Sequence, residues 1–147
     1  MVLDPDFKEF CQLLNANKVR YLVIGGYAVA FHGYPRYTKG IDIFLCIDQE
    51  NAIRVVQTLH DFGFFYSLGL QEEDFLEADI VVQLGNPPNR IDLIMGALGV
   101  NFEICYQSRI ETDIDGLTIP FIDLENLKKN KRASGRLQDL ADIENLE

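Results

Sequence analysis

The chain has 147 residues, of which 48% are hydrophobic and 24% charged, and its formal net charge is −10. This length and composition suit one domain with a real core and exclude a disordered tail. No apolar run reaches the roughly 18 residues that span a bilayer, and the N-terminus lacks a signal-peptide pattern, so we expect a cytoplasmic protein with no membrane partner. The negative charge disfavours general nucleic-acid binding and is better suited to a small nucleotide carrying a divalent metal.

The N-terminal segment predicts a helix, a strand and a second, short helix. Asp4 is placed to cap the first helix and Pro5 to begin it, and apolar residues recur at helical spacing as far as residues 15–17. Residues 21–24 (YLVI) predict a short strand that stops at a Gly-Gly pair. The following stretch is compatible with one short helix that Gly33 ends.

The rest of the chain predicts four strands and three helices. Residues 41–47 alternate between two faces, and Asp48 then caps an amphipathic helix. Residues 80–84 and 90–95 flank the turn NPPN and predict a hairpin. A late edge strand at 117–122 and helices near 124–131 and 135–146 complete the chain. This order predicts a single α/β (α+β) domain over residues 1–147, with helices packed on a mixed sheet.

Three features of these elements point to chemistry. Asp42 and Asp92 each stand alone in an apolar strand, where a carboxylate is costly unless it is paired, hydrogen-bonded or bound to a metal. For Asp92 the alternative is an ion pair with Arg90, because both side chains leave the same face of the strand. A Gly-Gly pair between a strand and a helix lets the backbone approach a phosphate, although a plain tight turn also explains it. Together the three features favour a metal and phosphate site.

The segment GGYAVAFHGYPRYTKGIDIF resembles the signature of the nucleotidyltransferase superfamily related to DNA polymerase β. In that signature a Gly-Gly or Gly-Ser pair precedes an acid–apolar–acid–apolar strand. RIDLI is similar to the strand of the third acid, and KRASGRLQDLADI is similar to the C-terminal helix of small bacterial AbiEii-type and MNT-type proteins of toxin–antitoxin and phage-defence systems. The resemblance implies a nucleotidyltransferase fold and transfer of a nucleoside monophosphate from an NTP to a hydroxyl acceptor with Mg²⁺, or alternatively Mn²⁺.

The resemblance also assigns roles to the matched acids and glycines. Asp42 and Asp92 would be the second and third catalytic acids and would hold the metal, and Gly25 and Gly26 would hold the triphosphate through backbone N–H groups. Gly40 stands where the family has its first acid. Because that acid serves both ions of a two-metal site, its loss is expected to slow the chemistry roughly a hundredfold or more.

Basic residues complete the implied site. Lys131 and Arg136 would reach the phosphate or the base, and Asp139 would orient their segment; for all three, a solvated helix face is the alternative. Arg36 and Lys39, just before the acid strand, would face a phosphate unless they lie in a solvated loop.

Three functional hypotheses follow from these residues. The first is an impaired nucleotidyltransferase whose hydroxyl acceptor is a protein side chain, a small molecule or an RNA end. The second is a pseudoenzyme that binds a nucleotide or a partner protein, and the third is an adaptor without a ligand. A cognate protein partner would supply substrate-selecting regions. The preferred NTP and the oligomeric state are left open.

Overall fold

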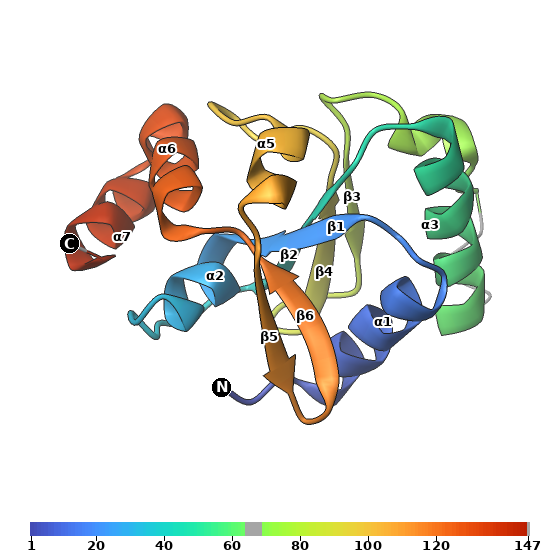
Figure 1. The fold of residues 1–147 in the computed structure, drawn as a ribbon, viewed down its shortest axis with the longest axis horizontal. Helices are drawn as coiled ribbons and strands as arrows, with labels where there is room; N and C mark the ends of the chain where they lie inside the picture. Colours follow the sequence, from blue (N-terminus) through green and yellow to red (C-terminus); the bar gives the residue numbers. More distant parts are fainter. Residues whose placement is uncertain (64–68, 147) are drawn as a thin grey trace.

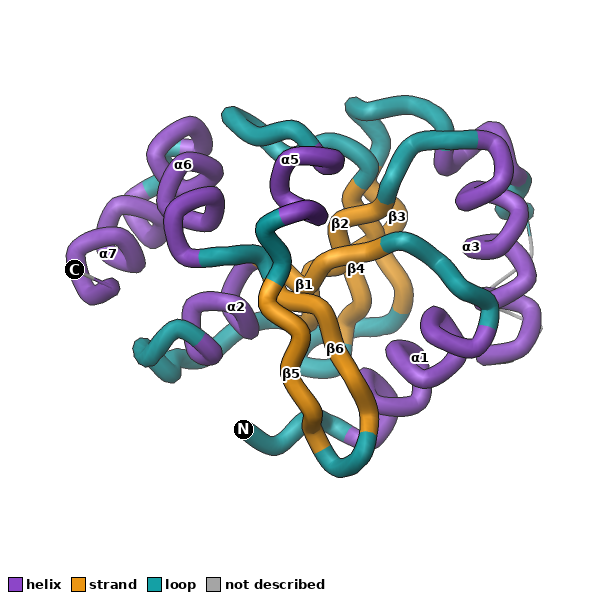
Figure 2. The backbone as a smooth tube through the Cα atoms, in the orientation of Figure 1, coloured by secondary structure: helices purple, strands orange, loops and turns teal. Residues whose placement is uncertain are grey.

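The structure is a computed structural model that describes residues 1–63 and 69–146. Within these residues, a six-stranded mixed sheet forms the centre of the fold (Figures 1 and 2). The strand order is β3-β4-β2-β1-β6-β5, in which β2 runs parallel to β4 and β1 parallel to β6. The elements in chain order are α1 (Pro5–Ala16), β1 (Tyr21–Ile24), α2 (Gly25–Phe31), β2 (Gly40–Leu45), α3 (Gln49–Phe62), the 3₁₀ helix η1 (Glu72–Phe75), β3 (Val81–Leu84), β4 (Arg90–Ile94), α5 (Phe102–Gln107), β5 (Ile110–Ile114), β6 (Leu117–Phe121), α6 (Leu124–Ser134) and α7 (Leu137–Leu146). The predicted α+β class with a mixed sheet is therefore confirmed.

Side-chain caps begin the two longest helices, as the sequence predicts. Asp4 accepts a hydrogen bond from the backbone N–H of Asp6 at 2.8 Å, and Asp48 accepts one from Asn51 at 2.7 Å. These caps satisfy N–H groups that have no partner inside the helix. The helices α1 and α3 then pack together, with the rings of Phe10 and Phe62 edge to face at 5.1 Å between centroids.

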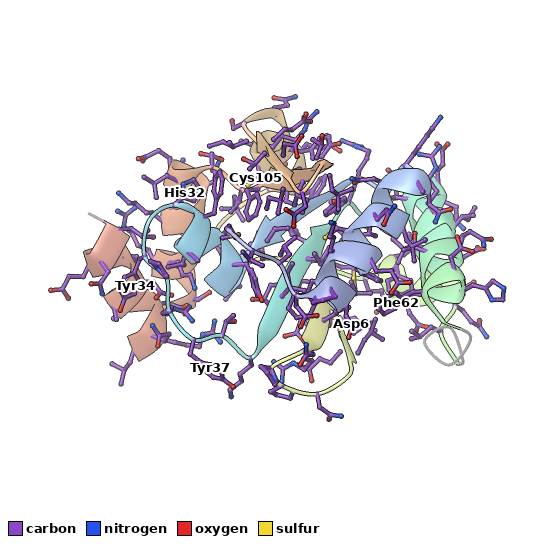
Figure 3. All side chains as sticks on the ribbon, turned by 90° about the horizontal axis from the view of Figure 1, so that it is seen from below. Asp6, His32, Tyr34, Tyr37, Phe62 and Cys105 are labelled. Atoms are coloured by element: carbon purple, nitrogen blue, oxygen red, sulfur yellow. The ribbon has the colours of Figure 1, made fainter. Side chains whose placement is uncertain are left out.

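The core lies along the central strands and the helices that cover them. Leu22 of β1, Ile43 of β2 and Leu93 of β4 are fully buried, and each such side chain contributes about 1.5–3 kcal/mol to folding by leaving water. At the other end of the molecule from α1 and α3, α6 and α7 lie beside α2 (Figure 1). His32, labelled in Figure 3, ties α2 to the end of β6 through a 2.8 Å hydrogen bond between its Nε2 and the Ile122 carbonyl.

The prediction that residues 117–122 form an edge strand was wrong. The strand β6 lies between β1 and β5, and β5 is the edge. The sequence reading missed β5 because IETDI is polar and mostly exposed, so it gives no apolar run. It also missed the six-residue helix α5, which is too short for helical periodicity to stand out. Neither α5 nor any other helix in the described ranges has both the length and the apolar character needed to cross a bilayer.

Candidate functional site

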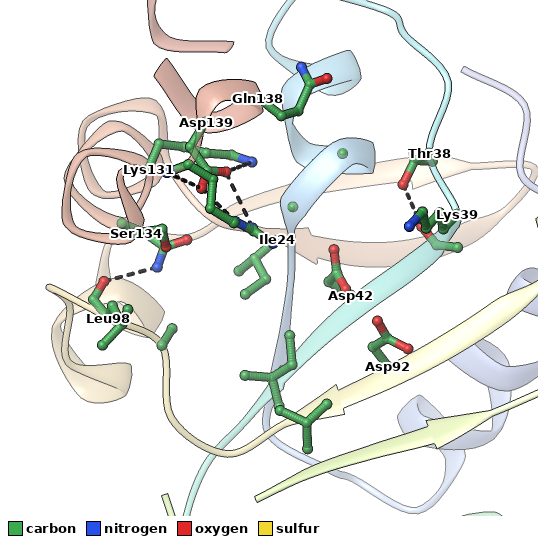
Figure 4. A pocket seen from close by; sticks show the side chains of 18 of the residues that line it. Ile24, Thr38, Lys39, Asp42, Asp92, Leu98, Lys131, Ser134, Gln138 and Asp139 are labelled. Atoms are coloured by element: carbon green, nitrogen blue, oxygen red, sulfur yellow. Dashed lines mark hydrogen bonds and ion pairs between the residues drawn. The ribbon is translucent and has the colours of Figure 1, made fainter. Parts of the chain in front are cut away.

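The parallel pairing of β2 with β4 brings the two in-strand acids together. Asp42 lies directly opposite Asp92, and Gly40 lies opposite Arg90. Since neighbouring strands are about 4.8 Å apart and these residues share a face, the two carboxyl groups stand side by side, as Figure 4 shows. Burial and the neighbouring Asp92 carboxylate raise the pKa of Asp42 to about 7, against the opposing charges of Lys131 and Arg90. The site therefore holds two carboxyl groups that resist being ionised together.

The glycine pair at the start of α2 lies against this acid. Gly25 has φ +65°, and a Cβ there would come within 1.9 Å of Asp42 Oδ2. A Cβ on Gly26 would come within 2.7 Å of Thr38 Oγ1 on the loop before β2. Both glycines are thus explained by close packing of the β1–α2 turn against β2, and Gly25 makes room for the Asp42 carboxylate.

A cavity of about 660 Å³ opens in front of the two acids. Its walls are the β1–α2 turn, the loop before β2, the strands β2, β3 and β4, the segment after β4 and the two C-terminal helices. The cavity is lined by all ten residues that were predicted from the sequence to form the site: Gly25, Gly26, Arg36, Lys39, Gly40, Asp42, Asp92, Lys131, Arg136 and Asp139. Their functional roles stay predictions, but the structure places them in one space.

A buried charge cluster holds α6 and α7 against the cavity. Lys131 Nζ lies 3.1 Å from Asp139 Oδ1 and 3.0 Å from Asp142 Oδ2. Arg36 donates two hydrogen bonds of 2.7 Å to the carboxylate of Asp142. Although burial acts against it, hydrogen bonds from Arg136 and Lys131 hold the pKa of Asp139 below its usual value. A solvated helix face is therefore wrong for Lys131 and Asp139, which are both buried, whereas the Arg136 side chain is 77% exposed.

Asp142 and Arg36 also belong to this cluster, and the sequence did not predict the ion pair between them. Asp142 is fully buried, yet in LQDLADIENL it looks like one more acid on a polar helix. The only sequence signal was its spacing of three residues from Asp139, which puts both carboxylates on one helix face. The partner that decides its burial, Arg36, is more than a hundred residues away in sequence.

The donor set does not fit a pair of divalent cations. Each oxygen of Asp92 accepts a hydrogen bond from Arg90, with Nε 2.8 Å from Oδ1 and Nη2 3.0 Å from Oδ2, so the ion pair considered from the sequence is present. Gly40 supplies no side-chain oxygen, and a Cβ there would lie 1.9 Å from the Arg90 carbonyl oxygen. Across residues 1–63 and 69–146, no group of three or more His, Cys, Asp or Glu side chains is placed to hold a metal ion. Two acids, one already paired, are too few for the two-metal arrangement that the resemblance implies.

Comparison with solved structures finds this architecture in nucleotidyltransferases. TM1012, a proposed nucleotidyltransferase of Thermotoga maritima, superposes with a TM-score of 0.63 at 16% identity, covering 99% of this chain and 94% of its own. The protein has the nucleotidyltransferase fold. The lincosamide antibiotic adenylyltransferase LnuA, with lincomycin bound, gives a TM-score of 0.56 at 20% identity and coverages of 99% and 96%. An antigenic nucleotidyltransferase-like protein of Paracoccidioides brasiliensis gives 0.54 at 16% identity, with 99% and 78% covered.

No protein-family model and no curated protein matches the chain. At these low identities the solved structures establish the nucleotidyltransferase fold, as the sequence motifs predicted. Assignment to the AbiEii or MNT branch remains a prediction.

Proposed function

We propose that the protein binds a nucleotide in this cavity and has lost efficient nucleotidyl transfer. The observation that carries the proposal is the β2–β4 pairing, which keeps Asp42 and Asp92 but sets Gly40 against the Arg90 backbone and commits Asp92 to the Arg90 guanidinium. The nucleotidyltransferase fold thus retains its ligand-sized cavity while the acids that would act on the ligand are incomplete.

The cavity suits a nucleotide in size and chemistry. Its volume of about 660 Å³ lies in the range of about 300–1,000 Å³ that is usual for small-molecule sites. One part of the wall carries the exposed basic side chains of Lys39 and Arg136, which would face the phosphates, whereas Lys131 is buried in its ion pairs with Asp139 and Asp142. Another part is apolar, with Val81 and Leu98 more than half exposed, and would face the base.

Loss of transfer follows from the site's acids. Two-metal phosphoryl transfer needs carboxylates that hold cations on the attacking and leaving oxygens, and the donor set at Asp42, Asp92 and Gly40 does not provide them. Removing even part of that stabilisation costs several kcal/mol of barrier, which is a rate loss of about a hundredfold or more.

The second candidate is nucleotidyl transfer itself, which one observation favours: Asp42 and Asp92 lie opposite each other in the ladder, as two acids that hold the same metal ion would. Under that candidate the protein moves a nucleoside monophosphate from an NTP to a hydroxyl acceptor. A cognate protein partner and a toxin–antitoxin setting belong to this proposal and rest on the sequence motifs. A cytoplasmic location is part of the same proposal.

Thermal shift with ATP, GTP, CTP and UTP, each with Mg²⁺, tests the proposal. A bound nucleotide stabilises the protein by about 2.7 kcal/mol at a concentration a hundredfold above its Kd, so Tm should rise in a saturable way. Lys39→Gln should weaken the shift, whereas Lys129→Gln, the same change at an exposed position outside the cavity, should not. The absence of a shift with all four nucleotides would overturn nucleotide binding. Pyrophosphate release that Asp92→Ala abolishes would favour the second candidate instead.

A further inference from the structure

We infer that Arg90 is the built-in cation of this site, and that a nucleotide's phosphates bind there directly to its guanidinium without a divalent metal. The inference rests on the nucleotide binding proposed above and concerns how the site neutralises charge. In this arrangement Arg90 takes over, beside Asp42 and Asp92, the neutralising role that a metal ion would otherwise have.

The geometry of Arg90 leaves it able to hold a phosphate. Its Nε and Nη2 donate to the two oxygens of Asp92, which uses two of the five N–H groups of a guanidinium and leaves three. The side chain is 23% exposed and lines the cavity. A planar guanidinium with N–H groups on more than one edge matches phosphate oxygens better than a point charge does. Arg90 can therefore bridge Asp92 and an anion.

Gly40 is the structural counterpart of Arg90. The two residues lie opposite each other in the parallel ladder, and a Cβ on residue 40 would come within 1.9 Å of the Arg90 carbonyl oxygen and 3.0 Å of its Cα. These are backbone atoms, so a rotamer change cannot relieve the contact. The missing acid and the close approach of Arg90 are thus one feature, and Gly40→Asp by itself does not recreate a metal site.

The charge balance of the cavity favours a bare anion. Its walls carry five basic residues and three acidic ones, an excess of two positive charges in a protein whose net charge is −10: Arg36, Lys39, Arg90, Lys131 and Arg136 against Asp42, Asp92 and Asp139. Counting Asp142, which pairs with Arg36 and Lys131 behind the wall, still leaves an excess of one. A divalent cation would add to this positive charge, whereas nucleotide phosphates neutralise it.

The first experiment uses Mn²⁺ alone, followed by electron paramagnetic resonance, and so does not depend on nucleotide binding. We expect the wild-type protein to bind Mn²⁺ only in the millimolar range or not at all. Arg90→Gln should bind it at least tenfold more tightly, because Asp42 and Asp92 then face the cavity without their cation. Arg109→Gln is the matched control, since Arg109 also pairs with an acid two residues later on an adjacent segment, Glu111, but outside the cavity. Equal Mn²⁺ affinity in wild type and Arg90→Gln would overturn the inference.

The second experiment measures ATP binding by calorimetry in Mg²⁺ and in EDTA. We expect the two wild-type Kd values to agree within about threefold, with Arg90→Gln weakening metal-free binding at least tenfold and Arg90→Lys, which keeps the charge, weakening it less. A thermal melt of each variant checks that it folds. Binding that disappears in EDTA would overturn the inference. Absence of ATP binding in every condition would defeat the proposed function and direct phosphate binding together, while the Mn²⁺ result would still decide whether Arg90 excludes a cation.

Discussion

The raised pKa of Asp42 makes a quantitative prediction about stability and pH. In the folded protein, burial and the neighbouring Asp92 raise this pKa from 3.8 to about 7. Between these two values the folded state keeps a proton that the unfolded chain releases, so the free energy of unfolding falls as pH rises from about 4 to about 7 and levels off above that. A rise from 3.8 to about 7 corresponds to a loss of about 4 kcal/mol.

Asp42→Asn removes this titration while keeping the shape of the side chain. Relative to the wild type, the variant should therefore gain up to about 4 kcal/mol between pH 4 and pH 8, most of it by pH 7. The charged groups that face Asp42 are Asp92 and Arg90 from β4, Lys131 from α6 and Arg136 before α7. Arg90 and Arg136 keep their charge over this range, because their hydrogen bonds to Asp92 and Asp139 raise the pKa of each guanidinium, and relief of the repulsion on Asp92 acts in the same direction as the gain.

Urea unfolding followed by circular dichroism at half-unit pH steps measures the effect. Asp79→Asn is the control, because Asp79 is an exposed acid outside the cavity, and its difference from the wild type should stay within about 0.5 kcal/mol at every pH. A difference between wild type and Asp42→Asn that does not change with pH would refute the reasoning, since it would mean that the Asp42 carboxyl group ionises in the fold as easily as in water.

Two further substitutions test the packing around the cavity. Gly25→Ala and Gly135→Ala impose the same backbone strain of about 1–2 kcal/mol, since both glycines have φ +65°, but only Gly25→Ala places a Cβ against Asp42. In urea unfolding, Gly25→Ala should therefore lose about 1–3 kcal/mol more free energy of unfolding than Gly135→Ala. Equal losses for the two variants would contradict the contact between residue 25 and Asp42. Lys131→Met leaves the buried carboxylates of Asp139 and Asp142 without their shared partner and should lower the free energy of unfolding by about 3–5 kcal/mol in the same assay. The control Lys129→Met, at an exposed position, should cost less than about 0.5 kcal/mol. Similar values for the two variants would mean that the buried cluster does not hold α7 in place.

The fold was predictable wherever local sequence carries its own signal. The first helix follows from a cap at Asp4 and an apolar face, and β1 from four consecutive apolar residues that are all buried. The order of strands at the edge was not predictable in this way. β5 has a weak pattern of its own and is held by a turn and by pairing with β6, so its existence depends on a neighbour rather than on its own composition.

The site divides along the same line. Asp42 and Asp92 were visible because a single acid in an apolar strand violates the local pattern, and the Arg90–Asp92 pair follows from the two-residue period of one strand. The partnership of Arg36 with Asp142 was not visible, because it joins a loop to a helix across most of the chain. The contact of residue 40 with the Arg90 backbone likewise depends on how closely two strands approach, which no property of either strand alone determines.

The structure therefore gives Gly40 a different explanation from the one that the sequence suggests. In the sequence it is a missing ligand, and the natural expectation is that restoring an acid would restore the site. In the folded protein the same position is closed by the backbone of Arg90, and the side chain of Arg90 pairs with Asp92, so the position without an acid and the cation beside Asp92 form a single pair of facing residues. Substitutions at these two facing residues are therefore not energetically independent, since each residue sets the space and the charge that the other meets. A site for two cations would therefore need changes at both Gly40 and Arg90, beyond the single Mn²⁺ ion that Arg90→Gln alone is expected to admit.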